Sequence, residues 1–599
     1  MCGYLITNLT LEKKKFSQAL KKQEYRGPDN SRVIKINNVF FGFNRLSIID
    51  LSDKSMQPLS FKNFIMCFNG EIYNYKELRS ELIENGVKFY SDGDGEVFLK
   101  IIYYFGKNKG LKKIRGMWSA IIYDTKKNEF FISRDRIGIK PLWYYTKDSE
   151  FIFSTDIKSI LYLIDNLNVS ENSIQDFLKY GILDESNKTF FEKIMMFPKG
   201  SYSNFNEKKK IKKIKFWKLN INKKKKFEKK KISNTFFKAL DQHLNSDVPV
   251  AITLSGGLDS SLLASYYSQK KNIKNKIKFF SLRMEAAEAE YKNIDKLVTT
   301  FKLDHQYFDV KESETIENLD ELIFNLGQPF RATQTFYQYL LRKEIRKQGY
   351  KVLLTGDGSD EIFAGYEECL NFFLAQPEIH DDKKEFLRYA QKMSTFSGKK
   401  ITELREESKK IFINKKYLYQ RVPDFELDSL KKKNSSFSKK KIYENINSLK
   451  EYMEMRLLKT PMPQWLRLED GSSMANSLET RIPYLDHFLV EEAFSFDNRE
   501  YFKGFKNKSI LRRIAGNYLP KFILSTKKKY HRPGSTLNFL KKDIIKDELF
   551  KIIRESKSLF NKDKKISFEK KFLTNNADFL FRVLVISRWK KIFNFDFNF

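Results

Sequence analysis

The stretch Ser255-Gly256-Gly257-Leu258-Asp259-Ser260 decides the fold of the second half of this chain. It follows an apolar, β-branched run over 248–254, which predicts a buried strand, and it precedes residues 261–267 (SLLASYY), which predict a helix. A strand, a glycine turn and a helix together favour phosphate binding, because the glycines let the backbone approach the ligand and the helix N-terminus offers free N–H donors. Asp259 adds a carboxylate suited to a magnesium-bound pyrophosphate. The chain has no Gly-Lys-Ser/Thr sequence, so the turn is not the common P-loop.

Cys2 is the second notable feature. It follows Met1 directly, and cysteine is small enough for the methionine to be removed, so we expect Cys2 to become the N-terminal residue. An N-terminal cysteine combines a nucleophilic thiol with an α-amino group of pKa about 8 that can act as the base. A cysteine at this position also occurs by chance, so its meaning depends on the motifs that follow.

Polar turns follow Cys2 at the ends of predicted strands and helices. They are Arg26-Gly27-Pro28-Asp29, Arg45-Leu46-Ser47-Ile48-Ile49-Asp50, Asn69-Gly70-Glu71, Asp92-Gly93-Asp94-Gly95-Glu96 and 134–142 (RDRIGIKPL). An arginine can hold an α-carboxylate through two hydrogen bonds, and a carboxylate can hold an α-amino group. An asparagine beside a glycine N–H can stabilise the oxyanion of an amide under attack. Each turn alone is equally well a loop with a salt bridge.

In this order the motifs resemble the class II glutamine amidotransferase domain of asparagine synthetases, over about the first 200 residues. The resemblance implies an N-terminal-nucleophile (Ntn) hydrolase-like αββα sandwich of the α+β class over residues 2–205. It implies that the Cys2 thiol attacks the side-chain amide of glutamine and releases ammonia, with Asn69 and Gly70 as the oxyanion hole. The glutamine-binding residues it implies are Arg45, Leu46, Ser47, Ile48, Ile49, Asn69, Gly70, Glu71 and Asp94.

A second acidic, glycine-rich turn, Thr355-Gly356-Asp357-Gly358-Ser359-Asp360-Glu361, follows the apolar strand 352–354. Three acids within five residues repel one another unless a cation lies among them, and Mg²⁺ is a suitable cation. The alternative is an acidic surface loop, which the apolar flanks argue against. The resemblance implies that Asp259 and Asp360 hold Mg²⁺ and that Asp357 is catalytic, at a position where many asparagine synthetases carry glutamate. The ATP-binding residues it implies are Leu254, Ser255, Gly256, Gly257, Asp259, Ser260, Leu282, Thr355 and Gly356.

Two later blocks extend the resemblance. Residues 473–486 follow the family's S-M-A-x-S-x-E-x-R-x-P-[FY]-L-D pattern, in which we expect Glu479 and Arg481 to be structural ion-pair partners. In 527–530 (KKKY) the resemblance makes Lys527 the catalytic lysine that neutralises charge at the acyl-phosphate centre. Three consecutive lysines leave the register open within 527–529.

The pattern along the chain predicts three regions. Residues 2–205 form the glutaminase domain, 206–231 a Lys-rich linker, and 232–599 an ATP-dependent synthetase domain. Helical and strand-like segments alternate after residue 232, which predicts an α/β parallel sheet followed by a helical C-terminal part. The resemblance implies that this sheet is of the ATP-pyrophosphatase type. An amphipathic helix formed by Ile232, Phe236, Phe237, Leu240 and Leu244 should precede the 248–254 strand.

The composition fits a cytoplasmic enzyme better than other classes. Three cysteines form no disulfide framework, so we expect Cys67 and Cys369 to be buried apolar positions. No apolar run long enough for a membrane span and no signal peptide is present. The net charge of +36 can mark a nucleic-acid binder, but many of the lysines gather in the linker and in 431–441. Lys, Asn, Ile and Phe are all abundant, as an AT-rich coding bias would make them.

We therefore expect a glutamine-dependent asparagine synthetase, with ATP as a substrate, Mg²⁺ as the cofactor and small molecules as its partners. A homodimer remains open. One alternative is an amidotransferase that amidates another carboxylate, such as a sugar acid of a surface polysaccharide, because Gln328 stands before Pro329 where the family often has an acid. A second is an RNA-modifying ATP pyrophosphatase, suggested by the charge and the 255–260 turn and opposed by the motifs around Cys2.

Overall fold

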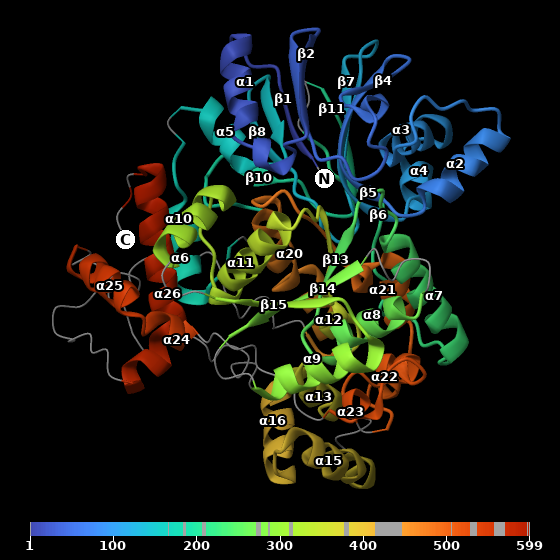
Figure 1. The fold of residues 1–599 in the computed structure, drawn as a ribbon, viewed down its shortest axis with the longest axis vertical. Helices are drawn as coiled ribbons and strands as arrows, with labels where there is room; N and C mark the ends of the chain where they lie inside the picture. Colours follow the sequence, from blue (N-terminus) through green and yellow to red (C-terminus); the bar gives the residue numbers. More distant parts are fainter. Residues whose placement is uncertain are drawn as a thin grey trace.

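The computed structural model describes residues 2–165, 167–183, 187–206, 211–270, 277–284, 288–310, 315–376, 382–413, 446–504, 506–526, 536–555, 570–595 and 597. In Figure 1 the N-terminal part, in blue and cyan, lies above a C-terminal part built around a parallel sheet, in green and yellow.

Two antiparallel sheets of six strands each form the N-terminal part. Their strand orders are β10-β8-β9-β1-β3-β2 and β12-β11-β7-β6-β5-β4. The strands are β1 Gly3–Thr7, β2 Asn30–Ile36, β3 Val39–Arg45, β4 Leu59–Phe61, β5 Phe64–Ile72, β6 Gly116–Asp124, β7 Glu129–Arg134, β8 Trp143–Lys147, β9 Glu150–Ser154, β10 Ile194–Met196, β11 Ser201–Phe205 and β12 Ile214–Lys215. The helices are α1 Lys13–Lys21, α2 Tyr75–Glu84, α3 Asp94–Phe105, α4 Lys107–Lys113, α5 Ile157–Leu163 and α6 Glu171–Tyr180.

The alternation of side chains along the strands produces four layers. In β1, Tyr4 and Ile6 pack in the core between the sheets, whereas Leu5 packs with the residues of α1 and α5. In β6, Ile121 packs between the sheets, whereas Trp118 faces α2 and α3. Successive strand residues point to opposite faces, so each sheet needs a partner sheet on one face and helices on the other. The predicted Ntn-hydrolase-like αββα sandwich is confirmed.

The C-terminal part is built on a parallel sheet of order β15-β14-β13-β16-β17. Its strands are β13 Val250–Thr253, β14 Ile277–Arg283, β15 His305–Asp309, β16 Val352–Leu354 and β17 Glu479–Arg481. Its helices are α7 Lys229–His243, α8 Leu258–Ser268, α9 Glu288–Phe301, α10 Thr315–Leu326, α11 Thr333–Lys347, α12 Ser359–Ile362, α13 Glu367–Leu374, α15 Lys383–Ser397, α16 Ile401–Ile413, α19 Leu449–Leu458, α20 Met462–Met474, α21 His487–Ala493, α22 Ser509–Ala515, α23 Lys521–Leu524, α24 Thr536–Leu540, α25 Asp543–Glu555 and α26 Lys570–Phe593. The predicted parallel sheet and its preceding helix are confirmed.

The strand order reverses between β13 and β16. From β13 the chain adds β14 and β15 on one side and then returns to add β16 and β17 on the other. The crevice at the carboxyl ends of the strands at such a reversal is where open α/β sheets bind ligands. The turns that begin at Ser255 and Thr355 follow β13 and β16, so they meet at this crevice.

The C-terminal helix α26 joins the two parts. Its Arg582 donates through Nε to the carbonyl of Leu178 at 2.9 Å, and its Trp589 donates through Nε1 to the carbonyl of Gly327 at 3.2 Å. The helix lies beside α6 and α10, as the red segment in Figure 1 shows. Among the described residues, no helix combines the length and apolar character that a membrane crossing requires.

Candidate active sites

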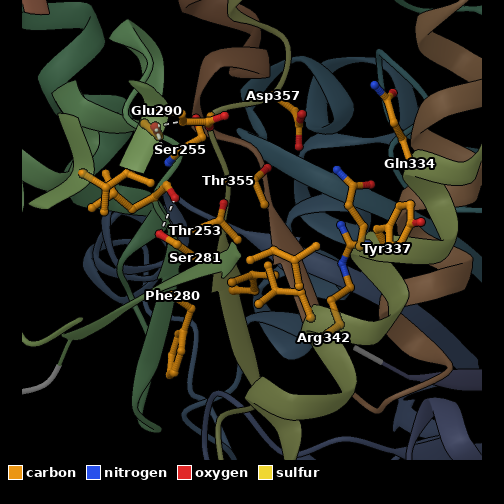
Figure 2. Close-up of a pocket in the computed structure, with 18 of the residues that line it drawn as sticks. Thr253, Ser255, Phe280, Ser281, Glu290, Gln334, Tyr337, Arg342, Thr355 and Asp357 are labelled. Carbon is orange, nitrogen blue, oxygen red and sulfur yellow. Dashed lines mark hydrogen bonds between the residues drawn. The ribbon is translucent and has the colours of Figure 1, made fainter. Parts of the chain in front are cut away.

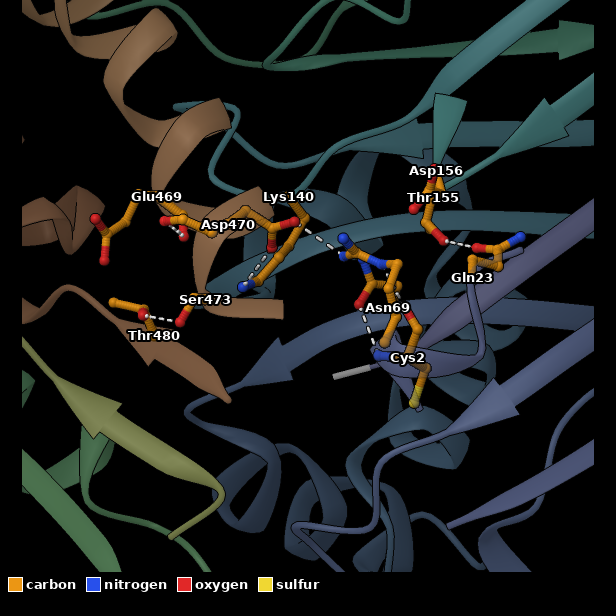
Figure 3. A network of polar contacts seen from close by, with 12 residues as sticks. Cys2, Gln23, Asn69, Lys140, Thr155, Asp156, Glu469, Asp470, Ser473 and Thr480 are labelled. Atoms are coloured by element: carbon orange, nitrogen blue, oxygen red, sulfur yellow. Dashed lines mark hydrogen bonds and ion pairs between the residues drawn. The ribbon is translucent and has the colours of Figure 1, made fainter. Parts of the chain in front are cut away.

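The thiol of Cys2 lies in a pocket of the N-terminal part. The residue is 8% exposed, and its main-chain nitrogen donates to Oδ1 of Asn69 at 3.0 Å (Figure 3). Burial raises the pKa of the Cys2 thiol, partly opposed by the Leu46 N–H and the Arg45 charge. The thiol is therefore neutral at rest and needs a base during attack. Seven of the predicted glutamine-binding residues line the same pocket: Arg45, Leu46, Ile48, Ile49, Gly70, Glu71 and Asp94.

Asn69 and Gly70 have the features that an oxyanion hole requires. The Nδ2 of Asn69 is buried and has no hydrogen-bond partner among the described residues, so this donor is available. Gly70 must be glycine, since a Cβ there would lie 2.2 Å from the carbonyl oxygen of Met117. The main chain of the neighbouring strand β6 therefore leaves room only for glycine at position 70.

Arg45 supports a loop in addition to lining the pocket. Its guanidinium donates to the carbonyl of Ser52 at 2.6 Å and to the carbonyl of Asp50. Ser47 was also predicted to bind glutamine, but its main-chain N–H donates to Oδ2 of Asp29 at 2.7 Å. Ser47 does not line the pocket, whereas its neighbours Leu46 and Ile48 do.

Among the carboxylates that line the pocket, Glu71 is buried and Asp94 is half-buried. Oδ2 of Asp94 accepts from the N–H of Ile72 at 2.8 Å, and burial raises the pKa of Asp94 to about 6. Oε2 of Glu71 lies 2.9 Å from a guanidinium nitrogen of Arg481, which belongs to β17 of the other part of the chain. Arg481 also pairs with Glu479 at 2.6 Å, so the predicted ion pair is confirmed and extends to the Cys2 pocket.

The predicted ATP-binding residues gather at the crevice where the strand order reverses. The pocket there is lined by Leu254, Ser255, Asp259, Ser260, Leu282, Thr355, Gly356 and Asp357. In Figure 2, Ser255, Glu290 and Asp357 lie at one end and Phe280 and Arg342 at the other. Gly256 shapes the turn, since it has φ +58° and a Cβ there would lie 2.9 Å from the Glu290 carbonyl oxygen. Gly257 lines the adjoining pocket.

This adjoining pocket holds an acidic pair with a lysine between its members. Nζ of Lys508 lies 2.6 Å from Oδ2 of Asp259 and 2.7 Å from Oδ1 of Asp360. Gly365 allows this approach, because a Cβ there would lie 2.3 Å from Cε of Lys508. The two carboxylates predicted to hold Mg²⁺ therefore converge on one point, and hard oxygen ligands of this kind suit Mg²⁺.

Lys508 was not predicted from the sequence. It stands before α22 with φ +50°, and the two acids that it contacts are 249 and 148 positions away in the chain. Lys527, which the resemblance favoured as the catalytic lysine, lies outside the described residues together with the rest of 527–535. Among the described residues, Lys508 lines the pocket with Asp357 and Asp360.

A second cluster in this pocket was also missed. Tyr366 donates through its hydroxyl to Oε1 of Glu361 at 2.5 Å, and the guanidinium of Arg456 stacks 3.7 Å from the centre of the Tyr366 ring. Burial raises the pKa of Glu361 to about 7. Arg331 and Trp465 line the same space, so the pocket offers cations and aromatic surface beside the acidic turn.

Buried charges near Cys2 join the two parts of the chain, and Figure 3 shows Lys140 and Asp470 among them. Asp470 on α20 pairs with Arg26 at 2.9 Å and with Lys140 at 3.4 Å, and Arg115 pairs with Asp486. All of these side chains are at most 4% exposed. Charges buried this deeply are stable only when paired, so they fix the two parts in one arrangement.

Comparisons with known proteins match two families to the two parts of the chain. Residues 231–577 match the asparagine synthase family, and residues 1–217 match the glutamine amidotransferase domain family. Asparagine synthetase [glutamine-hydrolyzing] 1 of Bacillus subtilis is 27% identical over 95% of this chain and 92% of its own length. A putative asparagine synthetase [glutamine-hydrolyzing] 2 of Methanocaldococcus jannaschii is 29% identical over 65% of this chain and 78% of its own length. Amidase chyE of Penicillium rubens is 24% identical over 88% of this chain and 86% of its own length.

Proposed function

Since this chain belongs to the asparagine synthase family, we propose that it makes asparagine from aspartate, ATP and glutamine. The observation that supports this best is the pairing of two pockets in one chain. One contains Cys2 among residues suited to an amino acid. The other contains Ser255, Asp259 and Thr355 where the order of a parallel sheet reverses.

In the first half-reaction, the sulfur of Cys2 attacks the amide carbon of glutamine. The α-amino group of a mature Cys2 would take the thiol proton and return it to the departing ammonia. Nδ2 of Asn69 and the backbone at Gly70 would stabilise the oxyanion, and a water molecule would then hydrolyse the thioester to glutamate. The buried, unpartnered Nδ2 of Asn69 supports this assignment.

In the second half-reaction, the aspartate carboxylate attacks the α-phosphorus of ATP and pyrophosphate departs. This step is needed because a free carboxylate would have to expel oxide, whereas an acyl-adenylate expels AMP. The 255–260 turn would hold the pyrophosphate, and Lys508 would balance its charge beside Asp259 and Asp360. Asp259 and Asp360 are the residues that would hold Mg²⁺, which would supply further positive charge at this site.

Ammonia must travel from Cys2 to the acyl-adenylate without protonation, because ammonium is not a nucleophile. We infer an internal passage through the interface between the two parts. The side chains there include Ser473 and Thr480, whose hydroxyls hydrogen-bond at 2.6 Å (Figure 3). The presence of both pockets in one chain supports such a passage.

An alternative keeps both half-reactions but amidates another carboxylate, such as a sugar acid. It is favoured by Gln328, which is 2% exposed and stands where the family often has an acid. It is also favoured by Arg331 and Arg456 in the acceptor pocket and by a relative whose name is an amidase.

Exchange of labelled pyrophosphate into ATP shows whether aspartate or a sugar acid is the substrate. With the wild-type chain, aspartate should support exchange, and the same assay with other carboxylic acids gives the comparison. Exchange with a sugar acid and none with aspartate would reject asparagine synthesis in favour of the alternative. Formation of AMP with glutamine present, followed over a panel of acids, would identify the acceptor.

A further inference from the structure

The glutamine pocket is completed by a residue from the other part of the chain. Arg481 ends β17 of the parallel sheet, and its side chain is fully buried. Its guanidinium nitrogen lies 2.9 Å from Oε2 of Glu71, which lines the pocket that holds Cys2. The contact joins residues 410 positions apart in the sequence.

Each of the three nitrogen atoms of this guanidinium lies against an acceptor oxygen. Nε donates to Oε1 of Glu479 at 2.6 Å, and one terminal nitrogen donates to the carbonyls of His243 at 2.8 Å and Asn245 at 2.6 Å. The other terminal nitrogen faces Glu71. Because three acceptors hold the planar guanidinium of Arg481, it cannot rotate. The position of its fourth partner, Glu71, is therefore fixed as well.

The two carboxylate oxygens of Glu71 have different surroundings. Oε2 faces Arg481, whereas Oε1 is buried and has no hydrogen-bond partner among the described residues. A buried carboxylate oxygen without a donor is costly, which points to a donor supplied by a ligand. The α-ammonium of an amino acid in the Cys2 pocket is such a donor.

Burial alone would make Glu71 a poor partner for an ammonium. It raises the pKa of the Glu71 carboxyl, and the charges of Asp94 and Glu479 raise it further. A protonated carboxyl neither attracts an ammonium nor accepts its hydrogen bonds as strongly as a carboxylate does. The Arg481 charge opposes all three effects.

We propose that Arg481 is a positioning residue of the glutamine site: it fixes one carboxylate oxygen of Glu71, so that the other receives the α-ammonium of glutamine. This rests on the proposed function, because it requires glutamine in the Cys2 pocket. The synthetase half thereby supplies the charge on which recognition by the glutaminase half depends. The main-chain carbonyl of Arg481 also accepts from the N–H of Thr355 at 3.1 Å, so the same residue adjoins the nucleotide pocket.

The test compares Arg481→Met with Arg115→Met. Arg115 is a matched control, since it is equally buried, crosses the same interface and pairs with Asp486 outside the glutamine pocket. Arg481→Met should raise the KM for glutamine about tenfold to a hundredfold and change kcat much less. Arg481→Lys should restore part of the loss. Arg115→Met should leave the KM for glutamine within about twofold of the wild-type value, even if it lowers the melting temperature as much as Arg481→Met does.

Two further readouts report on the ammonium specifically. Glutaramic acid is glutamine without its α-ammonium, and Arg481→Met should lose most of the wild-type preference for glutamine over this analogue. In a Glu71→Gln background, Arg481→Met should add no further loss. An unchanged preference, or additive effects of the two substitutions, would overturn the proposal.

Calorimetry separates failure of this inference from failure of the proposed function. Glutamine should bind Cys2→Ala protein and bind at least about tenfold more weakly when Arg481→Met is added. If the wild type does not hydrolyse glutamine but Arg481→Met still weakens glutamine binding, only the proposed glutaminase reaction is rejected. Equal binding by both proteins would reject the role of Arg481. Ammonia-dependent AMP formation, retained in Arg481→Met, verifies that the variant is folded.

Discussion

Lys508 and Asp259 are 249 positions apart in the chain, yet Nζ of the lysine lies 2.6 Å from Oδ2 of the aspartate. The lysine is 6% exposed, and burial lowers its pKa less than the two neighbouring carboxylates raise it. Lys508 is therefore a permanent positive charge at the point where the pyrophosphate of the proposed reaction would form. This makes it the first position to test in the synthetase half.

Lys508→Met should lower the rate of AMP formation by about a hundredfold or more, because the charge on the departing pyrophosphate loses a partner. Glutamine hydrolysis should be retained, since Cys2 lies in the other pocket. Both rates are measured on the same preparation. Lys503→Met is the control, because the Lys503 side chain is 65% exposed and pairs only at the surface with Glu500. Equal rates of AMP formation in the two variants would contradict this role.

Cys2→Ala should abolish amide formation from glutamine while free ammonia still supports it. The substitution removes the nucleophile and leaves the nucleotide pocket intact. Product formation with each nitrogen source is followed at saturating ATP. Cys67→Ala is the control, as Cys67 is fully buried in the core between the sheets. Equal loss with both nitrogen sources would show that Cys2 serves the synthetase reaction too.

Transfer of ammonia inside the protein predicts a one-to-one ratio of glutamine consumed to amide formed under saturating ATP and acceptor. Ammonia that stays within the interface cannot be protonated by bulk water, so little should reach the solution. The measurement follows glutamate, amide and released ammonium together, with a glutamate dehydrogenase trap for ammonium. Quantitative capture by the trap would argue against a passage.

Acid should weaken the interface between the two parts. His243 is 1% exposed, its ring stacks 3.7 Å from that of Tyr73, and burial holds its pKa well below 6.5. The folded protein keeps this imidazole neutral while the unfolded chain takes up a proton, so its contribution is complete above about pH 6.5 and decreases below it. The slope for one such group is at most about 1.4 kcal/mol per pH unit.

Urea unfolding of the wild type and His243→Phe between pH 8 and pH 5.5 measures this contribution. The difference in unfolding free energy between the two proteins should shift in favour of the variant as the pH falls. Other titrating groups are common to both proteins and cancel in the difference. Parallel curves for the two proteins would show that His243 does not titrate in this range.

The elements of the fold follow from local patterns. The apolar run before Ser255 becomes β13 and the run before Thr355 becomes β16, because short β-branched segments between turns are buried most readily as strands. Alternation in β1 and β6 places one face of each sheet between the sheets. Cys2, Glu71 and Asp94 were predicted together because their motifs resemble those of class II glutamine amidotransferases, and the structure brings all three to one pocket.

The sequence by itself determined which strands and turns this protein has, because these depend on neighbouring residues and on the side-chain periods of strands and helices. Only the tertiary structure decided which charges meet. Lys508 could not be assigned to Asp259 and Asp360, nor Arg481 to Glu71, since no local pattern reports a contact made across hundreds of residues. The physical reason is that a buried charge takes its partner from whatever the packed fold places within about 4 Å, and distance along the chain plays no part in that choice.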